Sequence, residues 1–259
     1  MVRLYFKYLG MMIKSQLEYR KTFILLACSQ MFSSLTCLLA IYFMFDKFGN
    51  INGYKFEEVI ICFIVSFFAF SIVECLFRGL DKFEDIISDG TFDRILTRPR
   101  PILFQVVSSR IEISKIGRMI LSIVALIAVL ANQPQLLQWD KLLTIFNMIF
   151  GTCILYSSIF IVRAGICFYT TQGLEIMNIF TDGVRDLTQY PLDIYGETVK
   201  KIFTFVIPAA LVNYYPFIYL IGRDTNIINM FCPLFVVILL IPSLIFWKIG
   251  VRKYRSVGS

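Results

Sequence analysis

Long apolar stretches constrain this chain more than any other feature of its sequence. Three of them, Thr22–Phe45, Val59–Phe77 and Ile227–Trp247, are each near the ~20 residues with which a helix crosses a bilayer. Hydrophobic residues make up 58% of the chain, and Phe alone contributes 26 residues. A soluble fold of this size would leave large apolar patches exposed to water. The sequence therefore predicts an all-α integral membrane protein.

Two further spans are predicted from weaker apolar runs. Leu142–Val162 has the length of a span, whereas Met119–Ala131 is short for one. The less polar residues Ile102–Val107, with the turns after them, are expected to extend this third span inward. The predicted outer loops are short, so the chain, 1–259, is interpreted as a single transmembrane domain.

The region 163–223 allows two interpretations. In the first, Ile202–Ile221 is the fifth span, although Pro208 and Pro216 disrupt a helical backbone, and the residues before it form a cytoplasmic loop. In the second, the more polar Ile166–Tyr190 is the fifth span, and the proline-containing segment dips back into the membrane from outside. Both interpretations give six spans with the same orientation of the chain ends.

The basic residues predict the orientation. Of 25 Lys and Arg, five precede the first span, eight lie in 78–118 and four close the chain. By the positive-inside rule, both termini and the segment between the second and third spans are cytoplasmic. A nucleic-acid partner is not expected, because that would require a basic face on a soluble module. Met1–Lys21 is basic and amphipathic and precedes a full-length apolar run, so no cleaved signal peptide is expected.

The sequence offers no chemistry of its own. It contains no histidine, and its seven cysteines are scattered singly, so structural zinc and redox motifs have no support. No phosphate-binding loop, nucleophile elbow or metalloprotease motif is present. We therefore expect a non-enzymatic chain that binds no metal or cofactor and must be driven by a partner.

One compact charged segment, Asp81–Pro101, separates the second and third apolar regions. Its apolar residues recur near helical spacing, Gly90 interrupts that pattern, and Thr97–Pro101 ends any helix, which predicts two short helices. Such a segment suits either docking on a cytoplasmic partner or lying on anionic headgroups. Four acidic residues within Glu84–Asp93 favour docking.

Acidic residues in or near the spans are candidates for function, since charges inside a membrane are costly. Glu74 lies near the inner end of the second span, and the simpler alternative is that it pairs with Arg78 one helical turn on. Glu175 and Asp182 lie in the polar stretch before Tyr190. Buried helix contacts or a solvated cavity wall explain these two acids at least as well as a functional role.

Five ordered blocks carry a resemblance that covers essentially the whole chain: Phe45–Gly49, Asp89–Arg100, Glu175–Gly183, Gln189–Leu192 and Asn213–Pro216. On these blocks the chain resembles the permease subunits of ABC-2-type exporters, in the bacterial group with two different permeases encoded beside one ATPase.

The resemblance implies a six-helix ABC-2-type transmembrane domain with three further elements. An amphipathic elbow helix, about 2–21, is expected to lie along the inner membrane surface. The charged segment, about 81–101, is expected to hold a coupling helix that fits a groove on the ATPase. Re-entrant helices, about 191–222, are expected on the outer side before the last span, which favours the second interpretation above.

The resemblance also implies a function and partners. The chain is expected to form half of a pathway for a hydrophobic or amphiphilic cargo (drug, peptide or lipid) in a bacterial plasma membrane. Two copies of an ATPase, which hold ATP and Mg, and a second, different permease are the expected partners. Closure of the ATPases would move the segment Asp81–Leu96 and lever the second and third spans. The expected coupling residues are Phe83, Glu84, Asp85, Ile86, Ile87, Phe92, Asp93, Arg94, Arg98 and Arg100.

Two other classes of protein are weighed against this one. A secondary transporter would need ion-coupling residues deep in the bilayer, for which Glu74 alone is a poor candidate. A membrane scaffold would use the charged segment to recruit a cytoplasmic partner that is not an ATPase. Co-purification of an ATPase would separate an exporter from both.

Overall fold

The computed structural model describes residues 2–170 and 174–255, and this part of the chain contains helices and no strand. Five helical segments are long and apolar enough to cross a membrane, which confirms five of the predicted spans. Three of them are single helices: α2 (Arg20–Phe48), α3 (Phe56–Leu76) and α9 (Trp139–Ile166). The segment Ile113–Asn132 ends in α8 (Ile116–Asn132). The segment Ile228–Lys253 comprises α14 (Ile228–Phe235), the 3-10 turn η4 (Val236–Leu239) and α15 (Leu240–Lys253).

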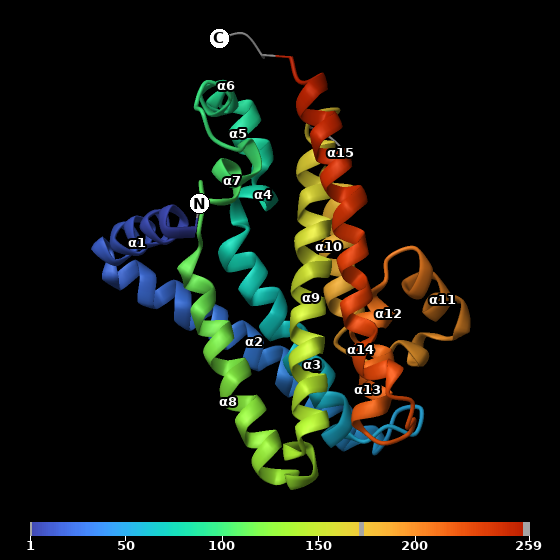
Figure 1. The fold of residues 1–259 in the computed structure, drawn as a ribbon. Coiled ribbons are helices and arrows are strands. Elements are labelled where there is room, and N and C mark those ends of the chain that lie inside the picture. Colours follow the sequence, from blue (N-terminus) through green and yellow to red (C-terminus); the bar gives the residue numbers. More distant parts are fainter. Residues whose placement is uncertain (1, 171–173, 256–259) are drawn as a thin grey trace.

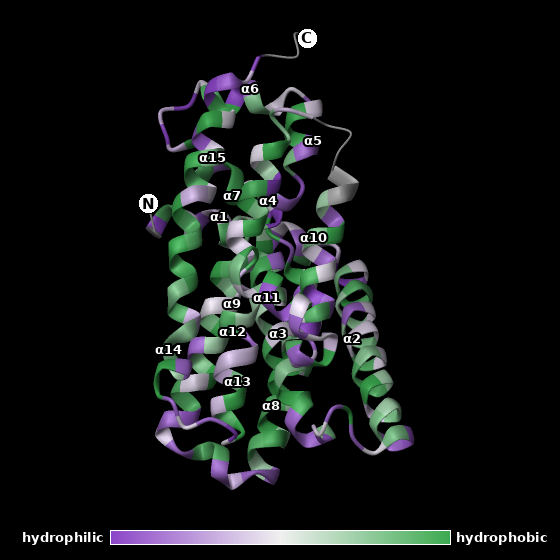
Figure 2. Ribbon diagram, turned by 90° about the vertical axis from the view of Figure 1, so that its right-hand side faces the viewer, coloured by the Kyte–Doolittle hydropathy of each residue, from purple (hydrophilic) through white to green (hydrophobic). Residues whose placement is uncertain are grey.

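The long helices form an elongated bundle with α3 and α9 at its centre (Figure 1). Both central helices are largely buried, whereas α2 lies along the outside and presents most of its apolar surface outward. Hydrophilic residues gather at the two ends of the bundle, and most of the helical surface between them is hydrophobic (Figure 2). This banding is what a membrane-spanning bundle requires, because lipid solvates the apolar middle and water the ends.

Close helix crossings depend on small residues. At Gly117 of α8, an added Cβ would lie 2.0 Å from the carbonyl oxygen of Ala27 in α2. At Gly151 of α9, it would lie 2.6 Å from the ring of Pro233 in α14. Small residues let helix backbones approach in a membrane, where van der Waals packing drives association. These crossings hold α2 on α8 and α14 on α9.

The charged segment folds into short helices at one end of the bundle. It follows α4 (Arg78–Asp81) and contains α5 (Phe83–Ser88) and α6 (Thr91–Leu96), separated by Gly90 at φ 65°. The prediction of two short helices split at Gly90 is confirmed, because the left-handed backbone there suits glycine and ends the first helix.

The third span differs from its prediction at its inner end. Ile102–Val107 forms a separate helix, α7, and does not extend α8. A turn follows α7, and within it the Glu112 amide donates a hydrogen bond to the Cys75 carbonyl. The span gains its length instead from the 3-10 turn η1 (Ile113–Lys115), which runs directly into α8.

The region after α9 does not form one continuous helix over Ile166–Tyr190, the fifth span of the second interpretation. Ile166 ends α9, and the next described helix, α10 (Leu174–Leu187), has 14 residues, fewer than the ~20 that cross a bilayer. The 3-10 turn η3 (Leu192–Tyr195) follows it. The boundary was missed because hydropathy alone does not mark the turn that ends α9.

A bent pair of helical segments completes this region. α11 (Glu197–Phe205) is bent by 89° against the segment of α12 (Ala209–Val212) and α13 (Tyr214–Leu220), at a break that contains Pro208. This shape fits a broken span or a re-entrant hairpin, so the re-entrant assignment of 191–222 stays a prediction. The break itself follows from Pro208, which lacks the amide hydrogen that a continuous helix needs.

The first helix, α1 (Val2–Glu18), lies crosswise beside the bundle near the start of α2, at the level just below the charged segment (Figure 1). Tyr5 stacks edge-on against Phe104 of α7 with ring centroids 6.4 Å apart. The amide of Ile113 donates a 3.1 Å hydrogen bond to the Gln16 side chain. These contacts fix α1 to the α7–α8 connection; its position on a membrane surface stays a prediction.

Candidate functional site

An aromatic cluster anchors the charged segment to the rest of the fold. Phe83 and Phe92 are fully buried, with ring centroids 5.2 Å apart. Phe83 also packs 5.0 Å from Trp247 of α15, and Phe92 packs 4.8 Å from Tyr254. Phe168, just beyond α9, contacts both phenylalanines at 5.2 and 5.3 Å. The cluster therefore joins α5 and α6 to the ends of α9 and α15.

This packing shows where the apolar face of the expected coupling residues lies, whereas its role in coupling stays a prediction. The apolar face of Phe83, Ile86, Ile87 and Phe92 does not face outward but forms part of the chain's own core. Helical periodicity identified the face correctly and could not say what covers it, because its partners come from α9 and α15.

The polar residues of the segment have different surroundings. Glu84 and Asp85 are half-buried and approach Lys82 (3.9 Å) and Arg110 respectively. Asp93 is also half-buried. The exposed tip, which we define as Ser88, Asp89, Leu96, Thr97, Arg98, Pro99 and Arg100, has no cover within the described chain. Arg94 is exposed as well.

Directly below the segment, Glu74 is the centre of a buried ion network. Its carboxylate lies 2.9 Å from Arg118, 2.9 Å from Lys115 and 3.4 Å from Arg78. The predicted pairing of Glu74 with Arg78 is therefore present, and it is the longest of the three contacts. Lys115 and Arg118 come from the start of the third span, so Glu74 joins α3 to α8.

The network continues through Asp81. This buried carboxylate pairs with Arg78 and, at 2.8 Å, with Arg163 of α9. Arg163 also donates a 2.8 Å hydrogen bond to the Asn178 side chain of α10. Arg78 pairs with Glu112 at 2.8 Å on its other side. One chain of contacts thus connects α4 with α3, α9, α10 and the residues before α8.

The charges within this network nearly balance. It contains three carboxylates and four cations among the described residues, namely Glu74, Asp81, Glu112, Arg78, Lys115, Arg118 and Arg163. Buried charges persist only when paired, since removing one partner leaves an uncompensated charge in a low dielectric. The network therefore fixes the relative positions of the helices that it joins.

From the sequence alone, Arg163 at the end of the fourth apolar run indicates no more than a positive-inside anchor, and Lys115 and Arg118 show no sign of a site. No local signal pairs them with Glu74 or Asp81, because the partners are far apart in the chain. Their common placement at the inner ends of predicted spans was the one available indication.

A small polar cavity of 210 Å³ lies beside the network. It is lined by Arg163, by Asp81 and, from α10, by Asn178, Thr181 and Asp182, among others. Asp182 is about half exposed and pairs with Arg185 at 3.0 Å, and a functional role for it stays a prediction. The side chain of Glu175 lies outside the described part of the chain.

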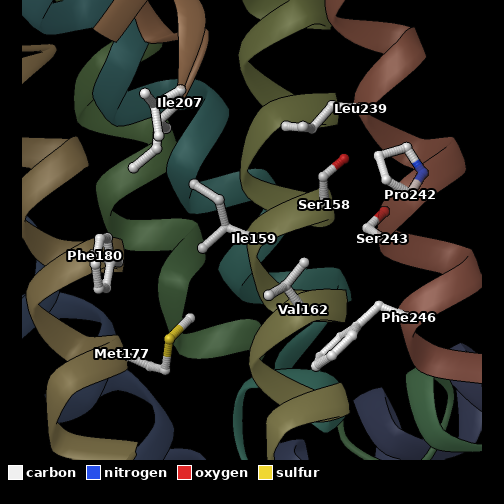
Figure 3. A pocket seen from close by; sticks show the side chains of 11 residues that line it. Ser158, Ile159, Val162, Met177, Phe180, Ile207, Leu239, Pro242, Ser243 and Phe246 are labelled. Atoms are coloured by element: carbon white, nitrogen blue, oxygen red, sulfur yellow. The ribbon is translucent and has the colours of Figure 1, made fainter. Parts of the chain in front are cut away.

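A larger pocket of 570 Å³ lies on the opposite side of α10 and is almost wholly apolar. Figure 3 shows side chains from α9, α10 and α15 converging on it, together with Ile207 from the bend after α11. Its lining residues are Ser158, Ile159, Val162, Met177, Phe180, Val206, Ile207, Leu239, Pro242, Ser243 and Phe246.

The pocket offers apolar contact and little hydrogen bonding. Its two serine hydroxyls already donate to carbonyls of their own helices, Ser158 to Ile154 and Ser243 to Leu240. A pocket of this size and lining suits a hydrophobic ligand or the apolar part of an amphiphile. No local sequence pattern indicates this pocket, because its walls come from segments that are far apart in the chain.

Among the described residues, no group of three histidine, cysteine or acidic side chains is placed to hold a metal ion. The seven cysteines are free.

Comparison with known families gives one match. The family model described as "ABC-2 family transporter protein" matches residues 31–258. A search of curated proteins and a search of solved structures each gave no match.

Proposed function

This chain belongs to the ABC-2 family of transporter proteins, and from that membership we propose that it is the permease subunit of an ATP-driven exporter. It is a multi-pass membrane protein whose family implies partnership with an ABC ATPase. ATP and Mg would be held by that partner, in two copies. The chain itself carries the pathway and the connection to the ATPase.

The observation that carries this proposal is the double attachment of the charged segment. The aromatic cluster joins α5 and α6 to α9 and α15, and the ion network joins α4 to α3, α8, α9 and α10. A push on the exposed tip would therefore reach the helices that line the apolar pocket. Packed side chains and ion pairs of this kind can carry coupling between two distant sites, here the ATPase-facing tip and the pocket.

The structural contacts change which helices the segment would lever. The second and third spans, α3 and α8, which were expected to be levered, are joined to each other through Glu74. The additional bond from Asp81 to Arg163 brings in α9, whose residues Ser158, Ile159 and Val162 line the pocket. ATPase closure would thus act on the pocket walls through α9 as well.

We place cargo contact at the apolar pocket, because its lining suits a hydrophobic or amphiphilic molecule. A single chain with one lateral pocket does not enclose a pathway, so a second permease, expected to be a different chain, would complete it. Both chain ends and the charged segment are placed on the cytoplasmic side of a bacterial plasma membrane. The positive-inside distribution of Lys and Arg supports this orientation.

The test is co-purification of the tagged chain with the ATPase encoded beside it. Asp89→Arg with Leu96→Asp reverses charge and removes apolar surface at the exposed tip without touching the buried cluster. The matched control is Trp139→Ser, which changes an 88% exposed residue at the other end of the bundle. We expect the tip variant to lose the ATPase and the control to keep it.

Retention of an intact and active complex by the tip variant would overturn the coupling assignment. Co-purification of the unaltered chain with another cytoplasmic protein and no ATPase is a different result. That result would favour the membrane scaffold over the exporter.

A further inference from the structure

A third cavity, of 270 Å³, lies between α1, α6 and α7 and has no part in the cargo proposal. Two of its lining residues, Arg94 and Arg98, are also among the expected coupling residues. Its lining combines two arginines with four hydroxyl groups and one amide, alongside two apolar side chains. The lining residues are Tyr8, Met12, Thr91, Arg94, Ile95, Arg98, Gln105, Ser108 and Ser109.

The cavity is basic. Among its lining residues none is acidic, whereas the neighbouring cavity beneath α1 contains Asp85 and Glu112 among its lining residues. Arg94 donates a 3.2 Å hydrogen bond to the Thr91 hydroxyl and has no carboxylate within ion-pair distance in the described chain. Arg98 likewise has no carboxylate partner among the described residues. Two guanidinium groups without counterions at one cavity are a site for an anion.

The walls of the cavity are fixed. Gln105 of α7 donates hydrogen bonds of 3.1 Å to the carbonyls of both Ile95 and Arg100, which ties the end of α6 and the following turn to α7. On the other side, α1 is held by the Gln16–Ile113 bond and the Tyr5–Phe104 contact described above. Arg94 of α6 and Arg98 of the following turn are therefore held in place by α7, and the opposing wall is a helix held in place as well.

The opposing wall has the properties of a helix at a membrane surface. Phe6 and Met11 of α1 are 63% and 57% exposed, although both are apolar. Arg3, Lys7 and Lys14 of the same helix are also exposed. The exposed face of α1 thus carries apolar and basic side chains together, as a helix does at the boundary between acyl chains and anionic headgroups. With α1 on a membrane surface, as predicted, the cavity would open beside the lipid phosphates.

We propose that this cavity binds the phosphate group of an anionic phospholipid of the adjoining leaflet. Arg94 and Arg98 contact the phosphate oxygens, and the Tyr8 and Thr91 hydroxyls flank it. The acyl chains lie against the exposed apolar residues of α1, such as Phe6. The bound lipid would then connect α1 to α6 and hold the charged segment at a fixed height above the membrane. The exposed tip at Asp89 and Leu96 stays open for a protein partner.

The experiment measures lipid selectivity of the full chain in phosphatidylcholine nanodiscs. Spin-labelled phosphatidylglycerol and spin-labelled phosphatidylcholine are compared by the fraction of label that the protein immobilises. We expect selective immobilisation of phosphatidylglycerol, and a fall of about tenfold in its relative affinity when Arg94→Gln and Arg98→Gln are combined, since two charge-assisted hydrogen bonds are lost.

The matched control is Arg100→Gln, which removes the same charge from the same turn but outside the cavity. It should keep the selectivity, and equal melting temperatures of the variants exclude unfolding as the cause. Three outcomes overturn the proposal: no preference for phosphatidylglycerol in the unaltered chain, equal selectivity in the double variant, or equal loss in the Arg100→Gln control. If the double variant keeps its lipid selectivity and loses the ATPase, the arginines belong to the protein partner.

Discussion

The carboxylate of Asp81 lies 2.8 Å from the guanidinium of Arg163, and both side chains are buried. This one pair joins the start of the charged segment to the inner end of α9. Since Arg163 also holds Asn178 of α10, the pair lies between the exposed tip and both helices that flank the apolar pocket. A mechanical connection of this kind predicts effects on stability and on transport.

Breaking the Asp81–Arg163 pair should destabilise the fold. Arg163→Met leaves a buried carboxylate with one fewer partner and should cost about 3 kcal/mol of unfolding free energy. Combining it with Asp81→Asn should cost less than the sum of the two single changes, with a coupling of about 1 kcal/mol or more. Thermal unfolding in detergent measures both, and additive effects would show that the pair is not coupled.

The crossing of α2 and α8 should be sensitive to a single methyl group. Gly117→Ala would place its Cβ 2.0 Å from the Ala27 carbonyl oxygen and should cost about 1–3 kcal/mol through forced separation of the helices. Gly183→Ala in α10 is the control, because nothing lies within 4 Å of its added Cβ. It should be neutral or stabilise α10 by up to about 1 kcal/mol. Equal melting temperatures for the two variants would contradict the close crossing.

Tyr54 should stabilise the loop between α2 and α3 through a hydrogen bond. Its hydroxyl donates to Asp193 at 2.7 Å, which ties the α2–α3 loop to η3. Tyr54→Phe should cost about 1–3 kcal/mol, because the half-buried carboxylate of Asp193 loses its donor. The control is Tyr42→Phe, at a 47% exposed position.

The Tyr54 contribution should depend on pH. Burial and the hydrogen bond to Asp193 raise the pKa of the Tyr54 phenol. A group whose pKa is raised by folding stabilises the fold below its unfolded pKa, about 10 here, and loses that contribution as the pH rises further. The difference in melting temperature between the chain and Tyr54→Phe should therefore be constant near neutrality and shrink above about pH 10. A difference that grows with pH would contradict the assigned hydrogen bond.

Filling the apolar pocket should impair transport without dissociating the complex. Val162→Trp places an indole into the 570 Å³ space, and Ile123→Trp adds the same group on the exposed side of α8. If cargo binding loses about 1.4 kcal/mol, uptake of a lipophilic dye into inverted vesicles should fall about tenfold in the first variant only. Unchanged uptake in a stable Val162→Trp complex would remove the pocket from the pathway.

The orientation can be read by labelling single cysteines with a membrane-impermeant maleimide, in a chain whose seven native cysteines are replaced. Asn52→Cys should react in intact cells, and Ser88→Cys only after lysis, since they lie at opposite ends of the bundle. Glu197→Cys decides between the two interpretations of 163–223. Reaction in intact cells agrees with re-entry from outside, whereas reaction only after lysis agrees with a cytoplasmic loop.

Several features of the fold follow directly from the residues. Apolar length located five spans, because lipid demands long uninterrupted helices, although it extended the third span wrongly into 102–107. Gly90 split the charged segment, since its left-handed backbone interrupts a helix locally. Each of these is a short-range property that the chain carries wherever it folds.

Other features required contacts between distant segments. The sequence marked Phe83 and Phe92 as one apolar face, and only the fold showed that Phe168, Trp247 and Tyr254 cover it. It marked Glu74 as an intramembrane acid with one neighbour in reach, and the fold added Lys115 and Arg118.

The sequence by itself thus determined that this is a helical membrane protein with a charged segment at one end of its bundle. Only the tertiary structure decided which faces of that segment remain exposed, and where a pocket opens. The reason is physical: periodicity records that a side chain must avoid water, whereas its partner is set by helix packing across the whole bundle.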